Sequence, residues 1–243
     1  MPKKTQHRSS QSNVKRRSAN SVIICKNVVK IYKSTNITVT ALNGVDLNIK
    51  EGEMVAIMGP SGCGKTTLLN CLSGLDSMDT GSVSLQGMEL ESLSDDKLSE
   101  FRAKNMGFVF QSYNLLPVLT TVENVELPLL VSGSSAKEAR KRSEAKLDDV
   151  GLLDWKQHLP GELSGGQRQR ATLARALVND PAIVWADEPT GNLDSTNEIE
   201  IMDLLTDLNK KNNQTFVIVS HSDYVGGRTN RIIKMKDGKV VKK

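Results

Sequence analysis

Residues 59–67 combine three glycines, a lysine and two threonines at a spacing that suits the binding of phosphate groups. In order they are Gly59, Pro60, Ser61, Gly62, Cys63, Gly64, Lys65, Thr66 and Thr67, which match the pattern G-x-x-x-x-G-K-[ST]. Glycines allow backbone N–H groups to turn inward around a phosphate, and a helix that follows adds the positive end of its dipole. We expect Lys65 to reach the β- and γ-phosphates of a nucleotide and the Thr66 hydroxyl to bind Mg²⁺.

The sequence on both sides of this loop supports that interpretation. The apolar run 54–58 precedes the loop as a strand would, and Leu68, Leu69 and Leu72 follow it at helical spacing. A chance glycine-rich turn, the alternative, would require neither flank. Cys63 lies within the loop, so we expect a group attached to its thiol to block the nucleotide sterically, and we assign the thiol no catalytic role.

A pair of acids, Asp187 and Glu188, ends a second apolar run at 182–186. Ligands of α/β proteins bind at the carboxyl ends of the parallel strands, so we expect both carboxylates beside the phosphate loop. Asp187 can hold Mg²⁺ through water, and Glu188 can accept a proton from an attacking water as a general base. The alternative is a pair of acids at the start of a helix. Trp185 is interpreted as core packing.

The segments that carry these residues indicate an α/β fold. Continuous apolar runs suit strands that are buried on both faces of a parallel sheet, and helical patterns separate them here. The runs are 54–58, 108–110, 182–186 and 216–219. The sequence therefore predicts a doubly wound α/β core.

Other segments predict elements outside this core. Residues 45–49 alternate between apolar and polar, as in a half-exposed antiparallel strand. Apolar pairs flank Asp237-Gly238, which predicts a hairpin turn. The stretch 112–164 contains no strand-like run beyond its start, and 136–150 is typical of a charged helix. We expect this stretch to be a helical insertion.

The composition fits a globular protein that is large enough to bury a substantial core. The chain has 243 residues, of which 38% are hydrophobic and 25% charged. No run of 18 apolar residues occurs, so we expect any membrane role to come through a partner. Three cysteines, Cys25, Cys63 and Cys71, are an odd number without metal-ligand spacing, and we interpret them as reduced thiols.

The basic character of the chain, with a pI of about 8.9, comes from its first 20 residues. Six of the 32 Lys and Arg lie there without any acid, which leaves 26 basic against 28 acidic residues in the rest. We therefore expect no nucleic-acid partner. Residues 1–20 are interpreted as a solvated tail, with an anchor to acidic lipids or a transit peptide as alternatives and no secretory signal.

A third motif precedes the apolar run at 182–186. Leu163, Ser164, Gly165, Gly166 and Gln167 spell LSGGQ before a helical pattern that Pro181 ends. Between a phosphate loop and an Asp-Glu strand end, LSGGQ resembles the signature of ATP-binding cassette (ABC) ATPases, and the resemblance covers about 21–243. It implies one nucleotide-binding domain over 21–243: a P-loop (RecA-like) core with an N-terminal antiparallel β subdomain and a helical subdomain at about 112–164.

The resemblance assigns further roles by position. Tyr32 is similar to the aromatic residue that stacks on adenine, and Gln111 to the glutamine that senses Mg²⁺, water and the transmembrane partner. Residues 191–194, ending in Asp194, resemble the D-loop, and His221 resembles the switch histidine that contacts the γ-phosphate.

Four short stretches are similar to the lipoprotein-release and macrolide-export branch of the family (LolD, MacB and FtsE-like proteins). They are 74–76, 113–117, 123–128 and 189–194. One departure is Ser222, which follows His221 where the family usually has an acid, and Asp223 comes one place later. The departure concerns the fine positioning of the switch histidine.

The resemblance implies a motor subunit that binds and hydrolyses ATP with Mg²⁺ at the cytoplasmic face of the cell membrane. Its partners would be a transmembrane permease and a second copy of itself, with two ATP molecules between the copies and each LSGGQ helix facing the other copy's γ-phosphate. Chromosome-maintenance ATPases share the signature but insert a long coiled coil, for which the 53 residues from Gln111 to Ser164 leave no room. Translation factors with tandem cassettes need two motif sets, and a cassette without catalysis would have lost Lys65, Glu188 or His221.

Overall fold

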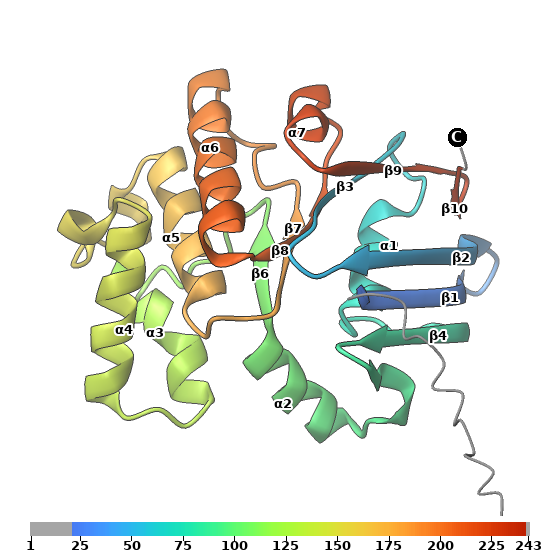
Figure 1. The fold of residues 1–243 in the computed structure, drawn as a ribbon, viewed down its shortest axis with the longest axis horizontal. Coiled ribbons are helices and arrows are strands. Elements are labelled where there is room, and N and C mark those ends of the chain that lie inside the picture. Colours follow the sequence, from blue (N-terminus) through green and yellow to red (C-terminus); the bar gives the residue numbers. More distant parts are fainter. Residues whose placement is uncertain (1–20, 242–243) are drawn as a thin grey trace, which may run out of the picture.

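Residues 21–241 are described by the computed structural model, in which helices pack around two sheets (Figure 1). The segment 1–20, expected to be a solvated tail, lies outside the described residues, as do residues 242–243.

The larger sheet has six strands and carries the predicted α/β core. In spatial order they are β10 (Lys239–Val240), β9 (Arg231–Lys236), β3 (Met54–Met58), β8 (Thr215–Val219), β7 (Ile183–Asp187) and β6 (Met106–Phe110). All but β10 run parallel to their neighbours. The four apolar runs predicted as parallel strands are confirmed. Asp237 and Gly238, with φ of 49° and 73°, form the predicted turn between β9 and β10.

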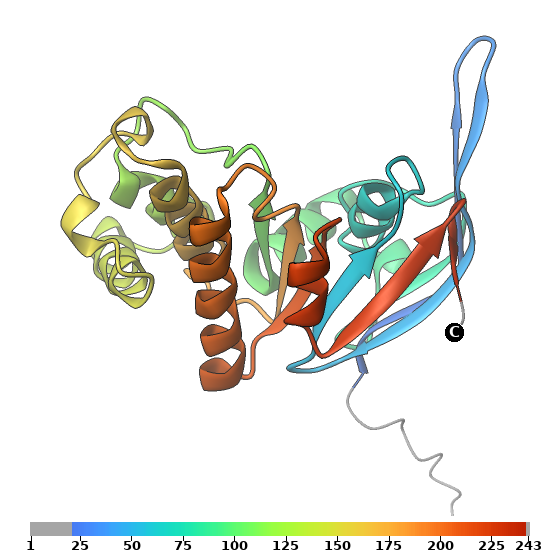
Figure 2. The same cartoon turned by 90° about the horizontal axis from the view of Figure 1, so that it is seen from above.

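The second sheet is antiparallel and contains the predicted strand at 45–49. Its order is β2 (Thr38–Lys50), β1 (Ser21–Lys33), β4 (Thr80–Leu85) and β5 (Met88–Glu89). The β1–β2 hairpin projects well beyond the rest of the molecule (Figure 2). Strands β4 and β5 were not expected from the sequence, because they are short and carry no long apolar run.

Seven α-helices are present in the described part of the chain. They are α1 (Lys65–Leu72), α2 (Asp95–Asn105), α3 (Thr121–Val131), α4 (Ala136–Asp149), α5 (Gly165–Leu177), α6 (Ser195–Asn212) and α7 (Asp223–Gly227). Helices α3 and α4 form the predicted helical insertion and pack against each other and α5. Because α3 and α4 are short, they do not form a long coiled coil. None of the helices between residues 21 and 241 combines the length and apolar character needed to cross a bilayer.

Two hydrophobic cores lie on opposite faces of the parallel sheet. Val184 and Phe216 belong to the core formed with α3, α4, α5 and α6, whereas their neighbours Trp185 and Val217 belong to the core formed with α1 and the antiparallel sheet. Because both faces are covered, every residue of β3 and β8 is buried. Trp185, fully buried, is confirmed as a core residue.

Candidate active site

The phosphate loop connects β3 to α1, as predicted. Gly64 precedes α1 with a φ of 98°, and a Cβ there would lie 2.4 Å from the carbonyl oxygen of Ala41, so the position requires glycine. Lys65 begins the helix and is 9% exposed. Its Nζ donates to the carbonyl oxygens of Gly59 (2.9 Å) and Pro60 (3.0 Å). The Lys65 ammonium group is therefore bound to the backbone at the start of the phosphate loop.

The side chain of Cys63 lies beneath the loop. Its side chain is 6% exposed and packs in the core beneath the loop, close to Gly59, rather than in the cavity above the loop. Its backbone N–H donates to the carbonyl oxygen of Pro60 at 3.3 Å. The expectation that a group attached to this thiol blocks the nucleotide sterically stays a prediction, and such a group would extend from the core beneath the loop.

A cavity of about 440 Å³ opens above the phosphate loop. Its walls come from the loop, from the β1–β2 hairpin and from Glu188; the lining includes Tyr32, Val39, Ala41, Ser61, Gly62, Lys65, Thr66 and Thr67. A larger cavity of about 670 Å³ lies at the amino ends of β7 and β8. None of the predicted site residues lines that cavity, so the smaller one is the candidate site.

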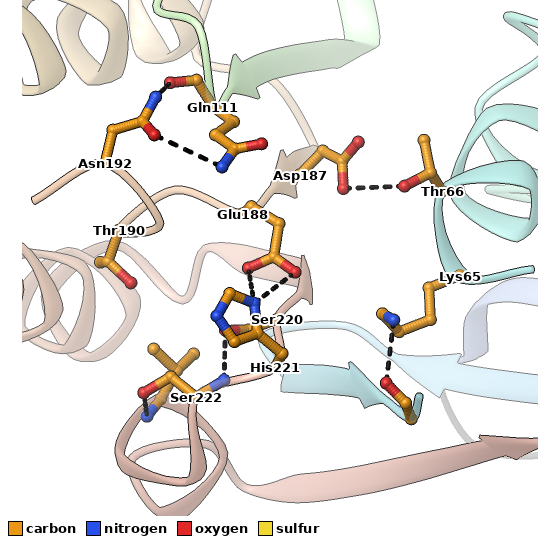
Figure 3. A network of polar contacts seen from close by, with 12 residues as sticks. Lys65, Thr66, Gln111, Asp187, Glu188, Thr190, Asn192, Ser220, His221 and Ser222 are labelled. Carbon is orange, nitrogen blue, oxygen red and sulfur yellow. Dashed lines mark hydrogen bonds and ion pairs between the residues drawn. The ribbon is translucent and has the colours of Figure 1, made fainter. Parts of the chain in front are cut away.

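The acid pair lies beside the loop, as expected from the parallel sheet. The Thr66 hydroxyl donates to Asp187 Oδ1 at 3.2 Å, although the two residues are 121 positions apart (Figure 3). Burial raises the pKa of the Asp187 carboxyl, and the neighbouring Glu188 charge raises it further. Hydroxyl and carboxylate oxygens are the donors that Mg²⁺ prefers, so this pair fits the ion. Among residues 21–241 no group of three His, Cys, Asp or Glu side chains lies close enough together to hold a metal ion.

We expect Asp187→Asn to raise the melting temperature of the nucleotide-free protein by up to about 3 °C at pH 7. A carboxyl whose pKa is raised by folding stabilises the folded state fully below its ordinary pKa, and this stability is lost as pH rises through the raised value. At pH 7 the ionised Asp187 carboxylate therefore lowers the free energy of unfolding. Thermal unfolding at pH 7 and pH 4 checks this, with exposed Asp207→Asn as control. The gain should shrink at pH 4, and a lower melting temperature at pH 7 would contradict the prediction.

Glu188 and His221 form a pair at the carboxyl ends of β7 and β8. His221 Nδ1 lies 3.0 Å from the Glu188 carboxylate (Figure 3). Glu188 has a left-handed φ of 49°, and its N–H donates to the carbonyl oxygen of Val219 at 2.9 Å. Strained backbone of this kind gathers at functional sites. The structure thus joins two residues that the sequence separates by 33 positions.

Ser222, the departure from the family pattern, is the N-cap of α7. Its hydroxyl accepts from the N–H of Val225 at 3.4 Å, and its own N–H donates to Ser220 Oγ at 3.1 Å. Asp223 occupies the first turn of that helix. The hydrogen bonds of Ser222 therefore stabilise the backbone that follows His221.

Gln111 is held by Asn192, a residue that the sequence did not single out. Asn192 Nδ2 donates to the carbonyl oxygen of Gln111 at 2.9 Å, and Gln111 Nε2 lies 3.5 Å from Asn192 Oδ1 (Figure 3). The predicted stretch 191–194 contains Asn192, but no spacing rule connects it to a residue 81 positions earlier.

The LSGGQ residues lie apart from the cavity of their own chain. Ser164 is the N-cap of α5 and forms a capping box with Gln167: Ser164 N–H donates to Gln167 Oε1 (2.9 Å), and Gln167 N–H donates to Ser164 Oγ (3.2 Å). None of the residues 163–167 lines the cavity. Asp194 caps α6 and binds Asn197, whose side chain fills the space beside Gly166.

The loop, the acid pair and the parallel sheet place this chain in the class of P-loop nucleotide hydrolases. Residues 42–191 match the family model described as "ABC transporter". The chain belongs to the ABC transporter family, as the LSGGQ resemblance indicated.

Similar proteins include the lipoprotein-releasing system ATP-binding protein LolD of Pseudoalteromonas translucida. It is 46% identical over 219 residues, which cover 90% of this chain and 94% of the relative. The dimeric structure of MJ0796, described as a bacterial ABC transporter cassette, has a TM-score of 0.84 and 46% identity, over 90% of this chain and 97% of that one. A post-hydrolysis state of MJ0796 bound to ADP and Pi has the same similarity values. The chain accordingly is an ATP-binding cassette of a transporter.

Proposed function

We propose that this chain hydrolyses ATP between two copies of itself and that the movement drives a transmembrane permease. The observation that carries the proposal is the position of LSGGQ, which does not line the cavity above its own phosphate loop. The amino end of α5 needs a second chain to meet a bound phosphate, and its helix dipole favours negative charge. A cassette with 46% identity has been solved as a dimer.

ATP would bind with its triphosphate on residues 59–67 and its base against Tyr32. Lys65 would leave the carbonyl oxygens of its own loop for the β- and γ-phosphates. Thr66 and Asp187 would hold Mg²⁺, with Gln111 nearby, and the ion would offset phosphate charge. Ser164, Gly165, Gly166 and Gln167 of the second copy would close the site, with Asp194 beside them.

Hydrolysis would then proceed by in-line attack of water on the γ-phosphorus. Glu188 would take a proton from the water while the bond from phosphorus to the bridging oxygen breaks, which leaves ADP and phosphate. His221, 3.0 Å from Glu188, would orient this carboxylate and contact the γ-phosphate. The two residues would thus act as a unit.

The work would be delivered at the cytoplasmic face of the membrane through the permease, which makes the reaction that of a translocase. Similarity to LolD supports lipoprotein release or another export or mechanical task. We further propose that residues 21–243 form one nucleotide-binding domain with a helical subdomain at about 112–164.

Mixing two inactive variants tests the shared site. Ser164→Arg blocks the LSGGQ helix but spares its own phosphate loop, and Lys65→Ala does the reverse. One site of the mixed dimer receives both changes, and the other receives neither. We expect each variant to be inactive alone and an equimolar mixture to recover up to about a quarter of the parental rate, since half the dimers would carry one intact site of two.

Phosphate release before and after mixing is the measurement. Mixing each variant with itself is the control. If the mixture stays inactive while each variant still exchanges subunits with labelled parent, the shared-site model is wrong.

A further inference from the structure

Asp76, which follows α1, binds two side chains of strand β1. Tyr32 Oη donates to Asp76 Oδ2 at 2.6 Å, and Lys30 Nζ donates to Asp76 Oδ1 at 2.7 Å. Lys30 also donates to the carbonyl oxygen of Ser77 at 2.7 Å. Hydrogen bonds to ionised groups are the stronger ones, so the two β1 side chains are firmly held.

The backbone around this contact is fastened as well. Asp79 Oδ2 accepts from the N–H of Ile31 at 2.6 Å, and the N–H of Asp79 donates to the carbonyl oxygen of Val29 at 2.9 Å. The segment 76–79 is therefore hydrogen-bonded to the end of β1 through both side chains and main chain.

The Tyr32 side chain is close to a cation and also lines the cavity. The ammonium group of Lys30, a residue only 8% exposed, lies over the ring at 5.1 Å from its centroid. Tyr32 itself is 43% exposed and lines the cavity above the phosphate loop. A cation thus lies over the ring, and part of the Tyr32 side chain remains exposed at the cavity.

We propose that Asp76 is a positioning residue for the base of the nucleotide: it holds the Tyr32 ring in place, with Lys30 behind it, as a ready platform for stacking. The assignment rests on the proposed function. A ring fixed in advance spares the ordering of a side chain, which costs about 0.5–1.5 kcal/mol when it occurs on binding, a factor of about two to twelve in affinity. Helix α1 then serves both ends of the nucleotide, since Lys65 begins it and Asp76 follows its carboxyl end.

Binding of ATP and of inorganic tripolyphosphate, both with Mg²⁺, separates the base from the phosphates. By calorimetry we expect Asp76→Ala to weaken ATP binding about three- to tenfold and to leave tripolyphosphate binding unchanged. In ATPase assays, KM for ATP should rise by a similar factor at constant kcat. Asp76→Asn keeps an acceptor for Tyr32 Oη but loses the charge, so its loss should be smaller. Exposed Asp207→Ala is the matched control.

A double variant shows whether Asp76 acts through the ring. On a Tyr32→Ala background, Asp76→Ala and Asp76→Asn should weaken ATP binding no further. The assignment is overturned if the loss persists on that background, or if tripolyphosphate binding falls equally, because either result indicates a structural role alone. It is also overturned if the parent binds ATP no more tightly than tripolyphosphate. A parent that binds neither ligand would instead overturn the proposed function, and this assignment with it.

Discussion

Glu188→Gln is expected to bind ATP, to lose about 10²- to 10⁴-fold in hydrolysis rate and to accumulate as a closed dimer. Glutamine has the shape of glutamate and can still accept from His221, which lies 3.0 Å away, but it cannot serve as the base. The γ-phosphate then persists at the interface. A ligand at 100 times its Kd adds about 2.7 kcal/mol to the state that binds it, so two ATP molecules can turn a weak encounter into a stable dimer.

Phosphate release and light scattering in saturating ATP measure both parts of this prediction. The parent should be mainly monomeric without nucleotide, and Glu100→Gln, a change at an exposed acid of α2, should behave as the parent. If Glu188→Gln remains monomeric in saturating ATP and Mg²⁺, the ATP-sandwich arrangement is wrong for this protein.

Lys65→Ala should abolish detectable ATPase activity and weaken ATP binding by at least about tenfold. The variant removes the cation assigned to the β- and γ-phosphates, and loss of one preorganised electrostatic group costs about 10²–10³ in rate. It also removes the bonds from Nζ to the carbonyl oxygens of Gly59 and Pro60, which hold the free loop. Both losses affect the phosphate loop, where ATP binds.

Steady-state phosphate release and calorimetric titration with ATP are the measurements. Lys97→Ala, at an exposed lysine of α2, is the matched control and should keep parental turnover. Normal turnover in Lys65→Ala would refute the assignment of the phosphate loop.

The sequence alone was enough to predict the parallel strands, the phosphate loop, the acid pair and the helical insertion. These features are local. A strand buried on both faces must be apolar throughout, as 54–58 and 216–219 are, and a phosphate loop needs its glycines and lysine within nine consecutive residues. The family resemblance rested on another local motif, LSGGQ, and the family is confirmed.

Only the tertiary structure determined which distant side chains meet and where they point. Asp76 lies 44 positions from Tyr32, and Asn192 lies 81 from Gln111, and no periodicity connects such pairs. The sequence also could not predict the direction of the Cys63 thiol, because a loop residue can face either the ligand or the core. In the structure the Cys63 side chain packs in the core beneath the loop. Residue types and short spacings determine the chemistry available to this protein. The register of the sheets and the packing of α1 against them decide which groups can act together.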